Sequence, residues 1–266
     1  MNKAAHTVLY ISHGAGPLPV LGDEGHTEMV DNLKLLAREI PRPSAVLVVS
    51  AHWEESVPTV TTAARPDLYY DYYGFPPESY ELRYPAPGDP DLARSVRDAL
   101  EDKGFATRAD GERGLDHGVF IPLTIMYPEA DIPCVQLSLI KGLDPAAHLA
   151  MGEALAGLTR DNLLIVGSGF SFHNMRAFFA QDTDETRAWN EAFEQWLIET
   201  CSAPSLDGAE RRQRLLGWES APHARYCHPR EEHLMPLHVC CGATDRACAA
   251  HYRLTIVGKR ASAYRW

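Results

Sequence analysis

The sequence predicts a single α/β domain in which helices flank a central, mostly parallel or mixed sheet. Short apolar runs rich in β-branched residues alternate along the chain with segments in which apolar residues recur at helical spacing. The chain has 266 residues, of which 45% are hydrophobic, enough to bury one substantial core. No Ser/Gly linker, low-complexity run or repeat marks a boundary. We therefore expect residues 1–266 to form one domain.

Six apolar runs are typical of buried strands, since each is short and rich in Val, Ile, Leu or Thr. They are residues 7–12, 45–50, 57–62, 132–140, 162–168 and 252–258. Four segments have helical spacing, namely residues 27–40, 89–104, 144–158 and 185–201. Two of these begin with Asp89-Pro90 and Asp144-Pro145, which place proline in a first helical turn after a capping carboxylate. Gly104 is typical of a helix end.

Residues 65–89 show neither the helical nor the strand spacing of apolar residues, and they are rich in tyrosine and proline. We expect a long irregular loop here, and loops longer than about 12 residues in compact domains are usually functional or disordered. The many aromatic side chains argue against disorder. Two interpretations stay open for this segment: the wall of a substrate site, or an Ω-loop with a purely structural role.

The charge and cysteine content argue against several classes of protein. The formal net charge is −11, whereas a sequence-independent nucleic-acid binder needs clustered Lys and Arg, and an anionic membrane surface is disfavoured likewise. No run approaches the roughly 20 apolar residues that span a bilayer, and the N-terminus lacks the features of a signal peptide. Six cysteines without a CxxC spacing are typical of buried thiols in a reducing compartment, so we expect a cytoplasmic protein.

Five of the twelve histidines occupy comparable places relative to the predicted elements. His13, His52 and His173 each follow the end of a predicted strand, and ligands of open α/β sheets bind outside these ends. His117 and His233 each precede an apolar stretch and are expected to open helices aimed at the same crevice. One histidine alone is more often structural. Several at strand ends indicate a metal site, because imidazole is the commonest metal ligand.

Three neutral imidazoles with open coordination positions suit zinc as a Lewis acid, or ferrous iron as a site for both substrate and dioxygen. Residue chemistry alone does not distinguish these metals. A further histidine could take a proton from a phenolic substrate, and His117 and His173 are the candidates. Other mechanisms are disfavoured, because the string VGSGF around Ser168 is not GxSxG and no GxGxxG or P-loop sequence is present.

Six short sequence strings, spread over nearly the whole chain, carry a resemblance to a known family. They are SHGAGP (12–17), SAHWE (50–54), YDYYGFPPESYELRYPAPGDP (70–90), GLDHGVFIPL (114–123), GSGFSFHNMR (167–176) and HPREEHLMPLHV (228–239). In this order they resemble the class III extradiol ring-cleavage dioxygenases, and specifically the DOPA 4,5-dioxygenase-like branch of that family.

The resemblance implies that His13, His52 and His233 bind one divalent metal and that no organic cofactor is needed. His233 stands where more distant class III enzymes have a glutamate. Three neutral histidines lower the negative charge of the site, so zinc stays open as the bound metal beside the ferrous iron that activity requires. His173 matches the acid/base position, with a role as fourth ligand also open. His117 matches a position that orients substrate or protonates an oxygen intermediate.

The implied reaction opens a DOPA-like catechol with dioxygen at a ring carbon next to the diol and yields a semialdehyde. Tyr72, Tyr73, Phe75, Tyr80 and Tyr84 are then expected to stack on the substrate ring, and Arg83 to pair with a substrate carboxylate. The expected partners are a small aromatic diol and dioxygen, without nucleic acid or membrane, and no oligomer is indicated.

Two alternatives remain at this point. The same histidines could hold zinc in a hydrolase that activates water. A non-catalytic relative could keep the fold and the shape of the site while binding a protein or peptide. Retention of all five histidines argues against the second alternative.

Overall fold

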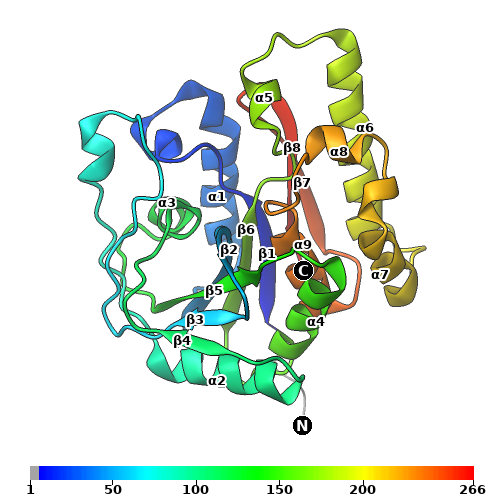
Figure 1. The fold of residues 1–266 in the computed structure, drawn as a ribbon. Coiled ribbons are helices and arrows are strands. Elements are labelled where there is room, and N and C mark those ends of the chain that lie inside the picture. Colours follow the sequence, from blue (N-terminus) through cyan, green and yellow to red (C-terminus); the bar gives the residue numbers. More distant parts are fainter. Residues whose placement is uncertain (1–5) are drawn as a thin grey trace.

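The computed structural model describes residues 6–266, and within them eight strands form one sheet in the order β4-β3-β5-β2-β6-β1-β8-β7 (Figure 1). The inner strands β5, β2, β6 and β1 pair in parallel, whereas β3–β5, β1–β8 and β7–β8 are antiparallel. The predicted α/β fold with a mixed sheet is confirmed. The strands are β1 (Thr7–Ser12), β2 (Ala45–Glu55), β3 (Thr59–Thr61), β4 (Arg108–Asp110), β5 (Cys134–Ile140), β6 (Leu163–Gly169), β7 (Ala250–Ile256) and β8 (Lys259–Arg265).

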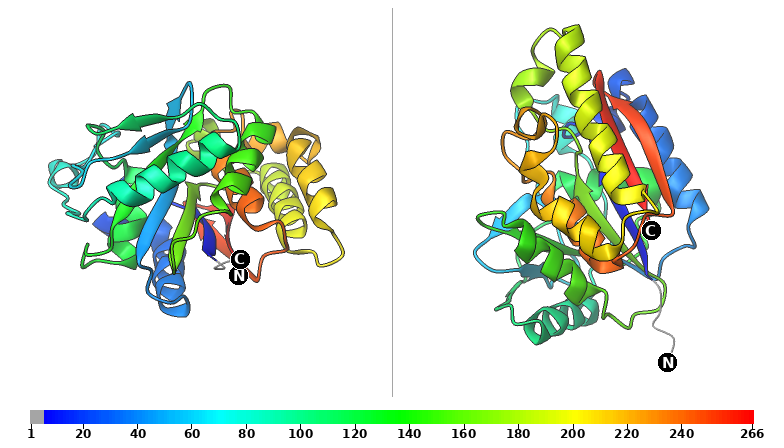
Figure 2. Two further views of the ribbon diagram at one scale, coloured as in Figure 1. Left: turned by 90° about the horizontal axis from the view of Figure 1, so that it is seen from below. Right: turned by 90° about the vertical axis from the view of Figure 1, so that its right-hand side faces the viewer.

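Helices cover both faces of this sheet (Figures 1 and 2). They are α1 (Thr27–Glu39), α2 (Pro90–Asp102), α3 (His117–Met126), α4 (Pro145–Leu155), α5 (Met175–Phe178), α6 (Asp184–Ser202), α7 (Gly208–Leu216), α8 (Ala224–Cys227) and α9 (Met235–Thr244). Side chains of a strand alternate between the two faces. Leu9 and Ile11 of β1 therefore join the core under α1 and α3, whereas Val8 and Tyr10 join the core with α2, α4, α6 and α9.

All six predicted strands and all four predicted helices are present, with ends shifted by a few residues. The capping predictions are confirmed, because the Asp89 carboxylate accepts a hydrogen bond from Leu92 N at 2.9 Å and Asp144 accepts from Ala146 N at 3.1 Å. Strands β4 and β8 and helices α5, α7 and α8 were not predicted. Strand β4 and helices α5 and α8 are only three or four residues long, and β8 and α7 are rich in charged residues without a clear period.

One predicted strand end is wrong. β2 continues to Glu55, so His52 lies inside this strand and not beyond it. The parallel pairing with β6 stops at Ser50, and the register against β5 shifts between Val49 and Glu54. Such an irregularity re-aims side chains while the strand continues. His52 therefore remains at the end of the sheet where β6 stops.

The two expected helix starts differ in outcome. His117 is the first residue of α3, as predicted, whereas α9 begins at Met235, so His233 lies in the turn before it. Among residues 6–266, no helix combines the length and apolar character needed to cross a membrane.

Candidate metal centre

Three imidazoles meet at the carboxyl ends of the inner strands. His13 directly follows β1, and its backbone N–H donates to Gly169 O at the end of β6, at 2.9 Å. The Nε2 atom of His52 lies 2.9 Å from Nε2 of His13 and 3.3 Å from Nε2 of His233. The structure therefore brings together the three residues that the sequence resemblance assigns to the metal. A single ion could contact all three nitrogens.

The turn after β1 directs His13 toward this centre. Gly14 has φ +80°, and a Cβ atom there would lie 2.7 Å from the His26 ring, so a larger residue would displace it. His26 Nε2 accepts a hydrogen bond from Ala15 N at 3.1 Å, and its Nδ1 donates to Asp23 at 2.7 Å. The His26 side chain thus fixes the chain directly after His13.

The hydrogen-bond partner of Nδ1 decides whether Nδ1 or Nε2 of an imidazole carries the proton. Ser168 Oγ donates to Gly118 O at 2.5 Å, so it accepts from His13 Nδ1 at 2.9 Å. His233 Nδ1 donates to Glu232 Oε1 at 3.0 Å. Nδ1 of His52 faces a carboxylate oxygen of Asp71 at 3.6 Å. The Nε2 atoms of His13 and His233 therefore carry lone pairs and no proton, and both point toward Nε2 of His52, an arrangement that a bound cation stabilises.

The electrostatics of the site keep these imidazoles neutral. Burial, followed by the proximity of the other imidazoles, holds the pKa of His13 and of His233 well below the usual range. Burial and His117 lower the pKa of His52 in the same way, although Asp71 opposes part of this effect. Neutral imidazole is the form that binds a metal, so the donor set fits a divalent ion without first losing protons.

His117 is held by Asp71. The Asp71 carboxylate accepts from His117 Nδ1 at 2.8 Å and from the His117 backbone N–H at 3.0 Å. Burial would raise the pKa of Asp71, but the hydrogen bonds and charge of His117 outweigh this effect and lower it. The centroid of the His117 ring lies 3.9 Å from that of His52. Asp71 therefore contacts a proposed metal ligand and a proposed catalytic residue at once.

His173 is held by Glu232 in a similar way. Glu232 Oε1 accepts from His173 Nδ1 at 2.9 Å, and the same oxygen receives the His233 hydrogen bond. The rings of His173 and His233 stack with centroids 3.4 Å apart and planes 19° apart. Burial would raise the pKa of Glu232, but the hydrogen bond and charge of His173 lower it. One ionised carboxylate thus orients both imidazoles.

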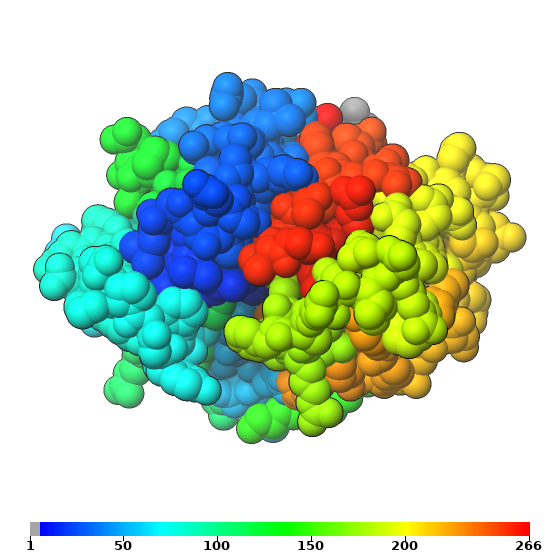
Figure 3. All heavy atoms as spheres, turned by 90° about the horizontal axis from the view of Figure 1, so that it is seen from above, coloured from blue at the N-terminus to red at the C-terminus, as the bar shows by residue number. Residues whose placement is uncertain are grey.

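A cavity of about 410 Å³ opens in front of the histidines. This volume is typical of sites for small organic ligands. All five predicted histidines line the cavity, together with glycines of the turn after β1 and a group of apolar side chains. Figure 3 shows this end of the molecule, where the loop near residue 75 (cyan) and the segment around α5 (yellow-green) border the opening from two sides.

The sequence assigned six residues of the 65–89 loop to substrate. Of these, Tyr72 and Phe75 line the cavity, and Tyr80 does not. Tyr73 is 91% exposed and does not line the cavity, and Arg83 is likewise exposed and absent from the lining. Tyr84 is buried, and its hydroxyl donates to Tyr127 O at 3.1 Å.

The 65–89 loop also packs on itself, as expected of an Ω-loop. Tyr70 OH donates to Leu82 O at 2.6 Å, and Tyr72 OH donates to Ser79 O at 2.5 Å. These bonds hold the loop in place, and only part of it faces the cavity.

Sequence reasoning missed the residues that orient the imidazoles: Ser168, Asp71 and Glu232. Glu232 is adjacent to His233, and Asp71 is the single acid in the string YDYYG, which are the signals that could have found them. Those signals are weak, because the chain contains 36 Asp and Glu residues.

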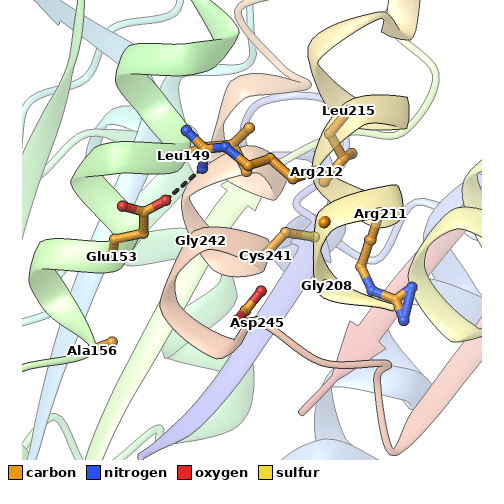
Figure 4. Close-up of a pocket in the computed structure, with 11 residues that line it drawn as sticks. Leu149, Glu153, Ala156, Gly208, Arg211, Arg212, Leu215, Cys241, Gly242 and Asp245 are labelled. Carbon is orange, nitrogen blue, oxygen red and sulfur yellow. Dashed lines mark hydrogen bonds and ion pairs between the residues drawn. The ribbon is translucent and has the colours of Figure 1, made fainter. Parts of the chain in front are cut away.

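A second hollow lies away from the histidines, between α4, α7 and α9 (Figure 4). Both of its arginines already have partners, since Arg212 donates to Glu153 at 2.5 Å and Arg211 donates to Thr200 O at 2.7 Å. No histidine is among the described residues that line it. This hollow therefore lacks the donor set of the first one.

A mixed α/β sheet whose strand ends present convergent neutral imidazoles beside a small-molecule cavity defines a class of non-haem metal proteins. Comparison with known proteins is more specific. Residues 7–261 match the family described as "Catalytic LigB subunit of aromatic ring-opening dioxygenase". The chain belongs to this family.

Relatives in fungi, plants and bacteria support this assignment. The chain is 46% identical over 260 residues to "Dioxygenase tasH" of Hapsidospora irregularis, covering 89% of this chain and 77% of that protein. It is 37% identical to "4,5-DOPA dioxygenase extradiol" of Beta vulgaris, covering 88% and 85%. A crystal structure of an uncharacterized Escherichia coli K12 protein superimposes with a TM-score of 0.77 at 28% identity, covering 97% of this chain and 98% of that chain.

Proposed function

We propose that this protein is an extradiol dioxygenase that opens a catechol ring with dioxygen at one metal ion held by His13, His52 and His233. The observation that carries the proposal is the orientation of the three imidazoles. Their Nε2 atoms meet at a common centre, while Nδ1 of His13 and of His233 donates to an oxygen acceptor and Nδ1 of His52 faces Asp71 at 3.6 Å. Membership of a family of ring-opening dioxygenases supports the same reaction type.

Ferrous iron, when bound, would supply Lewis acidity toward the catechol oxygens and the electron transfer that lets dioxygen attack a ring carbon next to the diol. Zinc fits the same three nitrogens, and its bound water would suit a hydrolase. The geometry of the protein does not distinguish the two ions. Identification of the metal is therefore part of the test.

His173 is the proposed base for the catechol proton. Its Nδ1 is engaged by Glu232 at 2.9 Å, which leaves Nε2 to accept a proton. Its side chain lines the cavity and is 20% exposed, so a bound phenol can reach it. His173 groups with Glu232 and His233 and not with all three metal-site nitrogens, which favours the acid/base role over that of a fourth ligand.

His117 is the proposed donor to a substrate oxygen. Its Nδ1 proton is committed to Asp71, so its Nε2 is the nitrogen free to hold or exchange a proton with the ligand. The hydrogen bond from the His117 backbone to the same carboxylate fixes the ring at the start of α3. Phe75 and Tyr72 lie on the loop side of the cavity, where they could contact the face or edge of the ring.

The test is anaerobic reconstitution with ferrous iron, followed by oxygen uptake and visible spectra on addition of catechols. We expect a yellow semialdehyde and one dioxygen consumed per ring opened. His13→Ala should lose metal and activity together, whereas His173→Ala should keep the metal and lose activity by about 100-fold or more. His251→Ala is the matched control, because His251 is exposed and lies outside the cavity.

Two results would contradict the proposal. Tight zinc binding without oxygen uptake for any catechol would favour the hydrolase or the non-catalytic relative. Full activity in His13→Ala would place the metal elsewhere.

A further inference from the structure

The cavity in front of the histidines has two ends of different chemistry. The inner end consists of imidazoles, of which His13, His117 and His233 are at most 6% exposed. The outer wall consists of apolar side chains from four separate segments. They are Leu18, Phe75 of the 65–89 loop, Met175, Phe178 and Phe179 of the α5 segment, and Val257 between β7 and β8.

Exposed apolar side chains are concentrated at this opening. Among the residues that the structure describes, three of the seven large hydrophobic side chains with high exposure line this one cavity: Met175 at 53%, Phe179 at 85% and Val257 at 38%. Single exposed hydrophobic residues are ordinary, but a group of them around one opening marks a binding surface. The rim therefore favours a ligand that covers it with apolar surface.

Cationic side chains are missing from the same wall. No Lys or Arg occurs among the described residues that line the cavity. Lys259, which follows the β7–β8 turn, is paired with Asp182, and Arg83 lies outside the lining. A substrate carboxylate would lose water without gaining a cationic partner, which is strongly unfavourable.

The charges that are present act against an anionic substituent. Asp23 lines the cavity, and Asp71 and Glu232 lie directly behind the imidazoles. Asp23 is the one acid among the described residues that line the cavity, but its carboxylate already accepts from His26 Nδ1 at 2.7 Å. It is thus a weaker partner for an ammonium group than a free carboxylate would be.

Building on the proposed function, we infer that the substrate is a catechol with an apolar, uncharged ring substituent, recognised by Met175, Phe178 and Phe179. This inference replaces the DOPA-like side arm and its contact with Arg83 that the sequence led us to expect. The diol lies at the imidazole end of the cavity, and the substituent extends toward the rim.

The test uses three catechols with side arms of similar length and different charge: propylcatechol, dihydroxyphenylpropionate and dopamine. With iron-reconstituted protein we expect kcat/KM for propylcatechol to exceed that of each charged compound by about tenfold or more. Binding to zinc-loaded protein, measured by calorimetry, should show the same order without any turnover. Equal or better values for the carboxylate or the amine would overturn the inference.

A pair of arginine substitutions tests which residues recognise the side arm. Phe179→Arg should improve kcat/KM for dihydroxyphenylpropionate and reduce it for propylcatechol, because it adds a cation to the rim. Tyr73→Arg is the matched control, since Tyr73 is similarly exposed (91% against 85% for Phe179) but does not line the cavity. An equal effect of both variants would refute recognition at the α5 segment. Failure of the dioxygenase proposal is distinguishable, because then plain catechol would not consume oxygen either.

Discussion

Glu232 shows how much of this site depends on residues that contact no ligand. One carboxylate oxygen receives hydrogen bonds from His173 and His233, and the stacked rings of these two histidines leave little freedom for either. Partners of this kind fix the tautomer of an imidazole and raise its basicity. Ser168 does the same for His13, as a neutral acceptor.

Glu232→Gln should weaken metal binding by roughly 10- to 100-fold, the usual effect of losing such a partner. A glutamine oxygen is a weaker acceptor than a carboxylate and leaves the Nδ1 proton of His233 less firmly held. Competition with a chromophoric chelator measures the affinity. Glu231→Gln is the control, because Glu231 pairs with Arg225 at 2.6 Å and contacts no metal-site histidine. Equal losses in both variants would show that Glu232 has no specific role.

His148 makes a separate prediction about pH. It is fully buried, with Nε2 accepting from Ile140 N at 3.2 Å, and burial lowers its pKa to about 4. The unfolded chain takes up this proton near its ordinary pKa of about 6.5, whereas the folded protein does not. The free energy of unfolding should therefore fall as pH drops from about 6.5 to about 4, by about 1.4 kcal/mol per pH unit from this group.

Thermal unfolding of metal-free protein across this pH range tests the prediction. His148→Gln should show a shallower decline than the wild type, because glutamine does not titrate. His251→Gln, which changes an exposed histidine, should decline as the wild type does. Identical slopes in all three proteins would contradict the assignment.

At the scale of elements, two glycines let β6 pack closely against the segment that carries His233. A Cβ atom at Gly169 would lie 2.1 Å from His233 O, and one at Gly167 would lie 2.5 Å from Pro236 O. Tyr10 of β1 donates to the same His233 carbonyl at 2.9 Å. The strand and the start of α9 are therefore in backbone contact, and this contact sets the height of His233 above the sheet.

Gly169→Ala should destabilise the fold by about 1–3 kcal/mol, as overpacking of a close contact does, and should also weaken metal binding. Denaturant unfolding and chelator competition measure the two effects. In the control, Gly217→Ala, the added Cβ meets nothing closer than 3.5 Å, so both effects should be small. Normal metal affinity in a destabilised Gly169→Ala protein would show that His233 does not depend on this contact.

The elements with strong periodicity could be predicted from the sequence, and the weak ones could not. Long apolar runs such as β1 and β6 and the capped helices α2 and α4 are determined locally. Strand β8 buries mainly small residues such as Ala261 and Ala263, and its pairing with β1 and β7 depends on distant segments. Its place in the sheet is a tertiary property that no local period signals.

At the scale of the whole molecule, topology explains which parts of the site the sequence could reveal. Parallel strands bring their carboxyl ends to one edge, so the convergence of His13 and His173 follows from element order alone. The orientation of loop residues does not. Tyr72 and Tyr73 are neighbours, yet one is 8% and the other 91% exposed, and no period in residues 65–89 predicts which faces the cavity. The partnership of Asp71 with His117 likewise exists only in three dimensions.

The separation of the three imidazoles along the chain also matters for folding. His52 and His233 are 181 positions apart, yet their nitrogens are 3.3 Å apart once the sheet has formed. An ion held by His13, His52 and His233 would link the first and last thirds of the chain. The unfolded chain would offer this ion no comparable site. At a free metal concentration of about 100 times Kd, this linkage adds about 2.7 kcal/mol to the free energy of unfolding. The supply of metal would then govern the lifetime of the folded chain as well as its chemistry.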